Sequence, residues 1–132
     1  MKKKALILLF ILGGIIMAFS INGQMQKAAE EKRNREYEVS LVKALKNSYR
    51  DIEEIELSSP DYSVPPGDWS CFVKLSFSDG EVVEYRMGHS LYLKINKSGV
   101  VTTAESEILS EHEGSTQSKV KVLFSDGRES VE

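Results

Sequence analysis

The spacing of hydrophobic and polar residues divides the chain into an apolar start, a helical stretch and a series of strands. The apolar start runs from Ala5 to Ile21. Residues 24–50 contain no Gly or Pro and many strong helix formers, which predicts a helix. This helix is polar on all sides up to about Glu38 and then carries apolar residues at helical spacing, which predicts that its second half packs on a sheet. The apolar residues are Leu41, Val42, Leu45, Tyr49 and Ile52.

Strands are predicted after this helix, where the period of the pattern changes to two. Residues 52–59 place apolar side chains on one side and acids on the other, which predicts a short strand ending before Pro60. Residues 58–68 contain three Pro and one Gly, which predicts a loop. The strongest alternation lies in residues 69–77, and two similar patterns follow in residues 81–87 and 91–96.

Residues 100–114 leave two interpretations open. Val100 to Thr103 suit a strand, whereas Thr102 followed by Glu105 resembles a helix capping box, with Gly114 as a helix end. We favour a strand followed by irregular structure.

The four residues FSDG occur twice, at positions 77–80 and 124–127. Side-chain parity decides the loop length, because residues opposite each other in an antiparallel pair share a face. A three-residue loop at 78–80 pairs apolar with apolar side chains throughout, whereas a two-residue loop mixes the faces. The expected pairs are Leu75 with Val83, Val73 with Tyr85 and Cys71 with Met87. Glycine suits the left-handed third position. We therefore interpret the repeat as turn chemistry and not as a calcium site, which would need further oxygen ligands.

These elements predict an α+β fold in which one amphipathic helix packs on an antiparallel sheet of hairpins, preceded by an N-terminal membrane helix or signal. The expected domains are a signal peptide or membrane anchor at 1–23, a polar helical stalk at 24–38 and a small α+β domain at 39–132. The second FSDG copy predicts another hairpin, with residues 128–132 as its short return strand.

The N-terminus has the layout of a targeting segment. Three lysines, Lys2 to Lys4, precede the apolar run, which favours a cytoplasmic N-terminus and an exported C-terminal part. We favour a retained, single-pass anchor that uses residues 5–21 as its membrane contact. Cleavage near Ser20, followed by secretion, stays open as the alternative.

Charge is distributed unevenly along the chain. Residues 24–50 hold seven basic and four acidic residues, a net charge of +3. Residues 51–132 hold seven basic and sixteen acidic residues, a net charge of −9. Such an acidic domain is expected to be repelled by nucleic acid and by anionic membranes, so nucleic-acid binding is not expected.

Residue types that carry catalysis or bind metals are sparse. The only cysteine, Cys71, permits no internal disulfide and falls on the apolar side of its strand, which predicts a buried, inert thiol. His89 is expected opposite Trp69 in a packing role, and His112 is expected to be solvated. Their separation matches no metal-ligand spacing, and no Gly-rich phosphate loop precedes a helix. We expect no enzyme activity, no metal and no cofactor.

A contact patch for a protein partner is expected around the Pro-rich loop. Aromatic and acidic residues gather there beside a strand surface, and this composition suits binding of a basic partner. An alternative is that the aromatic residues only cover the end of the core. The candidate contacts are Asp61, Tyr62, Asp68, Trp69 and Phe72.

The start MKKKALILLF, the charged stretch KAAEEKRNREYE and the strand GDWSCFVKLSFSDG carry a family resemblance. The chain resembles small membrane-anchored extracytoplasmic proteins of unknown function from low-GC Gram-positive bacteria, streptococci among them. Some proteins of this shape accompany secreted toxins as membrane-anchored immunity factors. The resemblance implies a non-catalytic, membrane-tethered, extracytoplasmic protein-binding domain that is immunity-like or envelope-associated. The alternatives are an accessory or sensor subunit of a membrane complex and, third, an unrecognised enzyme.

Overall fold

A computed structural model describes residues 27–63 and 68–132 of the protein. The chain divides by its internal contacts into two units, Met1–Arg33 and Asn34–Glu132. Within the first unit, residues 27–33 are helical. Among the described residues, no helix is both long enough and apolar enough to cross a membrane. The predicted anchor at residues 5–21 and the cleavage site near Ser20 lie outside the described residues.

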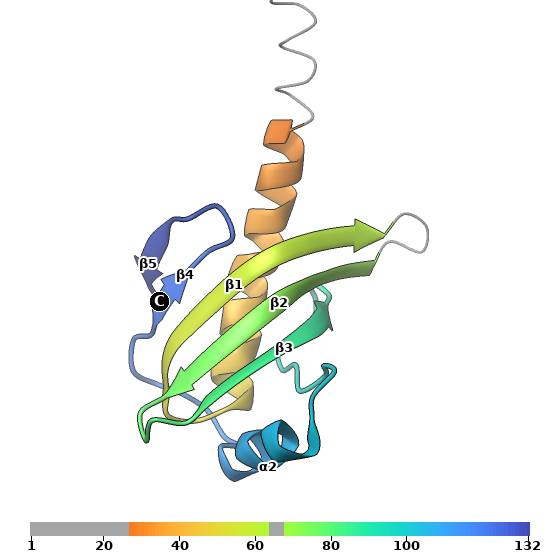
Figure 1. Cartoon of the computed structure of the whole chain (residues 1–132). Helices are drawn as coiled ribbons and strands as arrows, with labels where there is room; N and C mark the ends of the chain where they lie inside the picture. Colours follow the sequence, from red (N-terminus) through yellow and green to blue (C-terminus); the bar gives the residue numbers. More distant parts are fainter. Residues whose placement is uncertain (1–26, 64–67) are drawn as a thin grey trace, which may run out of the picture. The chain divides into compact units, whose positions relative to one another are not determined.

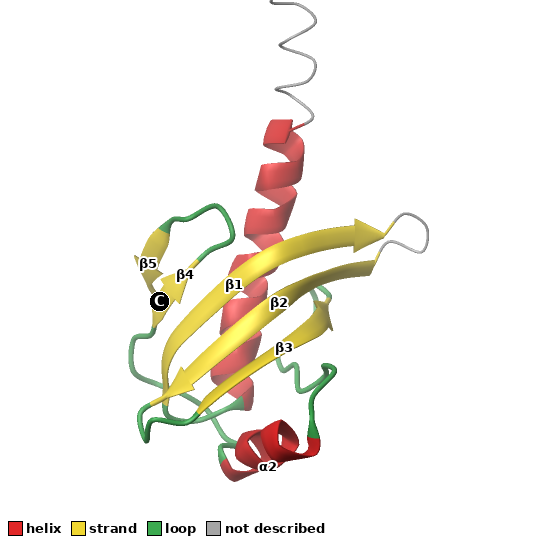
Figure 2. Ribbon diagram, in the orientation of Figure 1, coloured by secondary structure: helices red, strands yellow, loops and turns green. Residues whose placement is uncertain are grey.

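The second unit is an α+β domain, as the sequence predicts. Residues 34–48 are helical and cross one face of a five-stranded sheet (Figures 1 and 2). A second helix, α2 (Thr103–Glu111), follows the third strand. The sheet has the order β3-β2-β1-β4-β5. Its strands are β1 (Ile52–Ser63), β2 (Asp68–Phe77), β3 (Val82–His89), β4 (Lys121–Leu123) and β5 (Glu129–Val131).

The prediction of a wholly antiparallel sheet is wrong, because β1 and β4 pair in parallel. The other pairs, β1–β2, β2–β3 and β4–β5, are antiparallel. A parallel pair needs a long crossover between its strands. Here residues 90–120, which include α2, carry the chain from the edge strand β3 to the far side of β1. The sheet is therefore mixed.

One hydrophobic core joins the helix to the sheet. The predicted helix stripe is confirmed for Leu41, Val42 and Leu45, which are buried. The other two predicted members, Tyr49 and Ile52, are buried too, but the helix ends at residue 48 and Ile52 begins β1. The alternation along β2 is confirmed as well, because every second residue from Trp69 to Phe77 is buried against the helix side. Burying such apolar side chains contributes about 1.5–3 kcal/mol each, so this layer is the main source of the domain's stability.

Both FSDG segments form the predicted three-residue turns. The register pairs Leu75 with Val83, and the remaining expected pairs follow it. Gly80 and Gly127 have φ angles of +91° and +87°, in the left-handed region that glycine adopts most readily. Each turn aspartate accepts a backbone hydrogen bond two residues on. Oδ1 of Asp79 accepts from the Glu81 N–H at 3.0 Å, and Oδ1 of Asp126 accepts from the Arg128 N–H at 3.0 Å.

The helix also holds the second of these turns, at residues 125–127, through two charged side chains. Asp126 lies 3.6 Å from the Arg35 guanidinium, and the Glu38 carboxylate accepts a hydrogen bond from the Ser125 N–H at 2.8 Å. Glu38 is therefore buried, although the sequence predicts a solvated position for it. Burial raises the pKa of Glu38, while the Ser125 hydrogen bonds oppose that rise.

Three local predictions are wrong. Strand β1 does not stop before Pro60 but continues to Ser63. A register shift between Ser58 and Asp61, with Ser59 at a φ of +50°, lets the proline sit in a bulge. Residues 91–96 form no strand; helix side chains bond their backbone instead, at Leu91, Lys94 and Asn96. Residues 103–111 form helix α2, where the alternative capping box is present.

Candidate functional site

The five predicted contact residues do not form one patch. Trp69 is 1% exposed, stacks on Tyr37 at 5.1 Å between ring centroids, and donates a hydrogen bond from Nε1 to Oδ1 of Asn34 at 3.1 Å. Tyr62 lies opposite Trp69 and is half-buried on the same side. The remaining three residues are exposed, and strand alternation places them on the other face of the sheet. These are Asp61, Asp68 and Phe72. The Pro-rich segment 64–67 lies outside the described residues.

A different site, which the sequence did not indicate, lies between the helix and the loop after β3. It is a groove of about 560 Å³, which we call the basic groove. Its lining combines three basic residues (Arg35, Lys43 and Lys94), three apolar residues (Val39, Leu91 and Leu93) and three further polar residues (Glu36, Ser40 and Asn47). With one acid against three bases, the groove is positive in a domain whose net charge is negative.

One wall of the basic groove is a row along the helix. Arg35, Val39, Lys43 and Asn47 follow each other at intervals of four, so they lie above one another on one helix face. This spacing was readable from the sequence. The other wall comes from residues 91–94, which the sequence wrongly assigned to a strand, and this pairing of walls exists only in the folded domain.

Hydrogen bonds hold the loop wall in one conformation. Nδ2 of Asn47 donates to the Lys94 carbonyl at 3.1 Å, which ties the two walls together directly. The backbone N–H of Asn96 donates to Oγ of Ser48 at 2.8 Å, and this serine hydroxyl donates to the Ala44 carbonyl at 2.6 Å. Asn96 and Ser48 are both buried, so these bonds are protected from water.

A Ser–His–Asn chain borders the basic groove. Oγ of Ser40 lies 2.8 Å from Nε2 of His89, and Nδ1 of His89 lies 3.0 Å from Nδ2 of Asn96. A histidine oriented by a third polar residue is the arrangement that activates a serine nucleophile. The decisive question is which nitrogen of His89 carries the proton.

The hydrogen bonds of Asn96 answer this question. Its Nδ2 also donates to the Gly88 carbonyl at 2.8 Å, while its Oδ1 accepts from the Ser98 N–H at 3.1 Å. Because a carbonyl only accepts, Nδ2 must face Gly88 and therefore also donates to Nδ1 of His89. The neutral ring then carries its proton on Nε2 and donates it to Ser40.

This tautomer is the wrong one for catalysis, because a base for Ser40 needs an unprotonated Nε2. Burial lowers the pKa of His89 to about 4, so the ring is neutral at physiological pH. The predicted packing role for His89, opposite Trp69, agrees with its register and its burial. The chain of bonds positions the groove wall.

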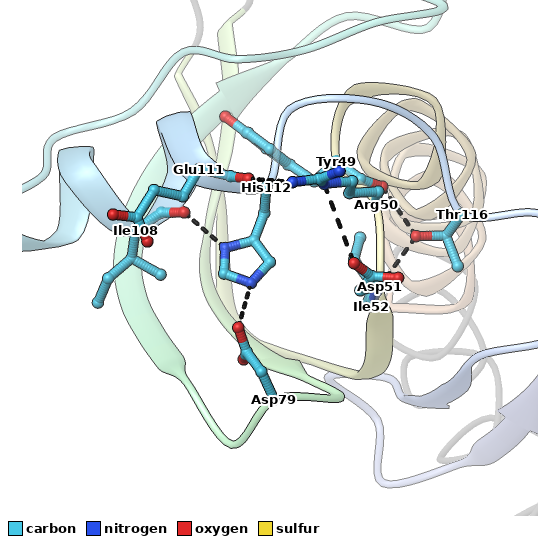
Figure 3. Close-up of polar contacts among 9 residues, drawn as sticks. All are labelled: Tyr49, Arg50, Asp51, Ile52, Asp79, Ile108, Glu111, His112 and Thr116. Atoms are coloured by element: carbon cyan, nitrogen blue, oxygen red, sulfur yellow. Dashed lines mark hydrogen bonds and ion pairs between the residues drawn. The ribbon is translucent and has the colours of Figure 1, made fainter.

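A second polar cluster surrounds His112, which the sequence wrongly predicts to be solvated (Figure 3). Its Nδ1 lies 2.6 Å from the Ile108 carbonyl and its Nε2 lies 2.7 Å from Oδ2 of Asp79, and its ring stacks on Phe77 at 4.0 Å. Both partner oxygens accept hydrogen bonds, so each ring nitrogen must carry a proton, and this geometry fits the imidazolium ion. Burial lowers the pKa of His112, but the hydrogen bonds to Ile108 and Asp79 and the charge of Asp79 outweigh it and raise the pKa.

The His112 cluster fastens the end of α2 to the rest of the domain. The backbone N–H of Arg50 donates to the His112 carbonyl at 2.7 Å, and Nη2 of Arg50 donates to the Glu111 carbonyl at 3.0 Å (Figure 3). Nearby, Oγ1 of Thr116 donates to the Tyr49 carbonyl at 2.8 Å. These contacts are structural joints and form no open site.

Two further candidates from the sequence are the Cys71 thiol and a possible metal site. Cys71 is buried, and burial raises the pKa of its thiol to about 12, which disfavours the nucleophilic thiolate. Within residues 27–63 and 68–132, no group of three His, Cys, Asp or Glu side chains is placed to hold a metal ion.

Comparison of the chain with protein-family models, with curated protein sequences and with solved structures gives no match.

Proposed function

We propose that the protein is a non-catalytic, membrane-tethered, extracytoplasmic domain that binds a protein partner in the basic groove. The observation that carries the proposal is the composition of this groove. Val39, Leu91 and Leu93 offer apolar contact, while Lys43 and Lys94 offer charge. A protein segment with apolar side chains next to carboxylates complements both features.

Preorganisation supports binding as the role of this groove. The wall from residue 91 to 94 is joined to the helix by the Asn47 hydrogen bond, and its continuation is held by Ser48. A site with fixed walls loses little conformational entropy when a ligand binds, which favours affinity. The partner expected from this groove is acidic, in contrast to the basic partner that the sequence suggested for the Pro-rich loop.

The tautomer of His89 supports the non-catalytic part of the proposal. A fluorophosphonate probe reacts with serines that a neighbouring base activates. We expect no labelling of the wild-type protein above the level of a Ser40→Ala variant. Labelling that is lost in Ser40→Ala would show an activated serine and would favour the enzyme alternative.

Site-specific photo-crosslinking tests the groove itself. A benzophenone amino acid is placed at Leu93, inside the basic groove, or at Phe72, which is 37% exposed on the other face of the sheet. In the cells that produce the protein, we expect a discrete protein adduct from position 93 and none from position 72. Lys43→Glu should abolish the adduct, while Lys121→Glu, an exposed reversal on β4, should preserve it.

Two results would contradict the groove as the binding site. One is an adduct that forms from position 72 alone. The other is an adduct at position 93 that forms equally well with Lys43→Glu.

The orientation of the domain is tested separately with a C-terminal tag on cells without a wall. External protease should digest the tag, and a protected tag would place the domain in the cytoplasm.

A further inference from the structure

The loop after β3 exposes an unusual set of apolar side chains. Leu91, Tyr92 and Ile95 are 49%, 82% and 54% exposed. Lys94 lies between them in the chain, and residues 90–104 contain two lysines and no acid. Exposed apolar and aromatic residues interleaved with lysine are typical of protein segments that contact the lipid–water interface.

Hydrogen bonds hold the backbone of this loop in place although its apolar side chains are exposed. The Leu93 N–H donates to the Ser90 carbonyl at 3.0 Å, and Nδ2 of Asn47 donates to the Lys94 carbonyl. At the end of the loop, the Val100 N–H donates to the Arg86 carbonyl at 2.9 Å. The apolar side chains are therefore presented to solvent by an ordered backbone.

Net charge alone predicts that anionic membranes repel this domain, but the folded structure separates the charges. Strands β1 to β3 carry six acidic and two basic residues, and α2 carries three acidic and no basic residues. The loop and the helix wall beside it carry Lys94, Lys43 and Arg35 against Glu36. Because electrostatic interactions fade over about 8 Å at physiological salt, the nearest charges decide what a surface attracts.

We propose that residues 91–95 are a contact site for a phospholipid bilayer containing anionic lipids. Leu91, Tyr92 and Ile95 enter the boundary between headgroups and acyl chains, and Lys94 lies at the phosphates. The proposal goes beyond protein binding in the basic groove and does not depend on it. It assigns a second role to this loop, which is to seat the domain on the membrane with its acidic sheet held away.

A fluorescent probe at position 92 tests this in the full-length protein. Tyr92→Cys is labelled with the polarity-sensitive dye NBD, since the native Cys71 is fully buried and does not compete for the label. The protein is reconstituted into phosphatidylcholine vesicles with or without phosphatidylglycerol. Val82→Cys, 46% exposed on β3, is the matched control position.

We expect blue-shifted emission and quenching by nitroxide-labelled lipids at position 92 in the anionic vesicles only, and neither effect at position 82. A lysine near an anionic surface contributes about fivefold in affinity, so Lys94→Ala should reduce the ratio of membrane-inserted to water-exposed probe about fivefold. Lys119→Ala, an exposed lysine outside the loop, should leave it unchanged.

Three results would overturn the proposal. The probe at position 92 could remain in water in both kinds of vesicle. Positions 92 and 82 could shift equally, which would show non-specific adsorption. The probe at position 92 could become shielded only when the crosslinked protein partner is added, which would assign the loop to a protein interface.

Discussion

Replacing Ser48 by Ala should loosen the wall of the basic groove. The Ser48 hydroxyl is fully buried, and it accepts the hydrogen bond from the backbone N–H of Asn96 at 2.8 Å. In Ser48→Ala, this N–H keeps its buried position and loses its acceptor. An unsatisfied buried donor costs about 1–3 kcal/mol, and the better helix propensity of Ala returns about 0.5 kcal/mol.

The expected net loss in the free energy of unfolding is therefore about 0.5–2.5 kcal/mol. For a domain of this size, each kcal/mol shifts the midpoint of thermal unfolding by roughly 4–8 °C. Circular dichroism of the full-length protein in mild detergent measures this shift. Amide hydrogen exchange reports the local effect, since the Asn96 amide should exchange faster in the variant than in the wild type.

Ser118→Ala is the matched control, because Ser118 is exposed. It should change neither the melting temperature nor the exchange of the Asn96 amide. The reasoning would be refuted if Ser48→Ala melted at the wild-type temperature and kept the Asn96 amide protected. That result would mean that this hydrogen bond does not hold the groove wall.

Two further predictions concern the joints of the domain. The folded-state pKa of His112 is raised above its unfolded value of about 6.5, so the folded state keeps the His112 proton to a higher pH than the unfolded state does. The free energy of unfolding should therefore fall as the pH rises from about 6.5 through the folded-state pKa. Urea unfolding at a series of pH values should show this slope in the wild type and lose it in His112→Gln; equal slopes would disprove the role of the ring. Gly99→Ala should destabilise the domain more than Gly80→Ala. Both glycines have positive φ angles, but a new Cβ at position 99 would lie 2.5 Å from Cδ2 of Tyr85, whereas a new Cβ at position 80 would have no atom within 4 Å. Thermal melting of both variants measures the difference, with about 1–2 kcal/mol expected for Gly80→Ala from its backbone alone.

Much of the fold could be predicted from the local spacing of apolar and polar residues. The period of the helix stripe and the alternation along β2 follow from which side chains must leave water, and these two features require only neighbouring residues. Parity across the first FSDG turn fixed the register of β2 and β3 for the same reason, because a shift by one residue would turn Cys71 and Val73 toward solvent. The turn glycines followed from backbone sterics.

Features that depend on distant segments were decided by the tertiary structure. The parallel pairing of β1 with β4 and the loop conformation of residues 91–96 depend on partners far along the chain. The candidate site belongs to this class. Lys43 and Lys94 are 51 positions apart, yet they line one groove because the loop after β3 returns to the helix.

The sequence by itself determined the type of most elements, the apolar face of each and the chemistry of the turns, since these depend on spacing within a few residues. Only the tertiary structure decided that Trp69 is buried against Tyr37 and is not available to a partner, that His89 holds its proton on Nε2, and that basic residues gather on an acidic domain. The physical reason is that burial, hydrogen-bond partners and local charge are properties of neighbours in space.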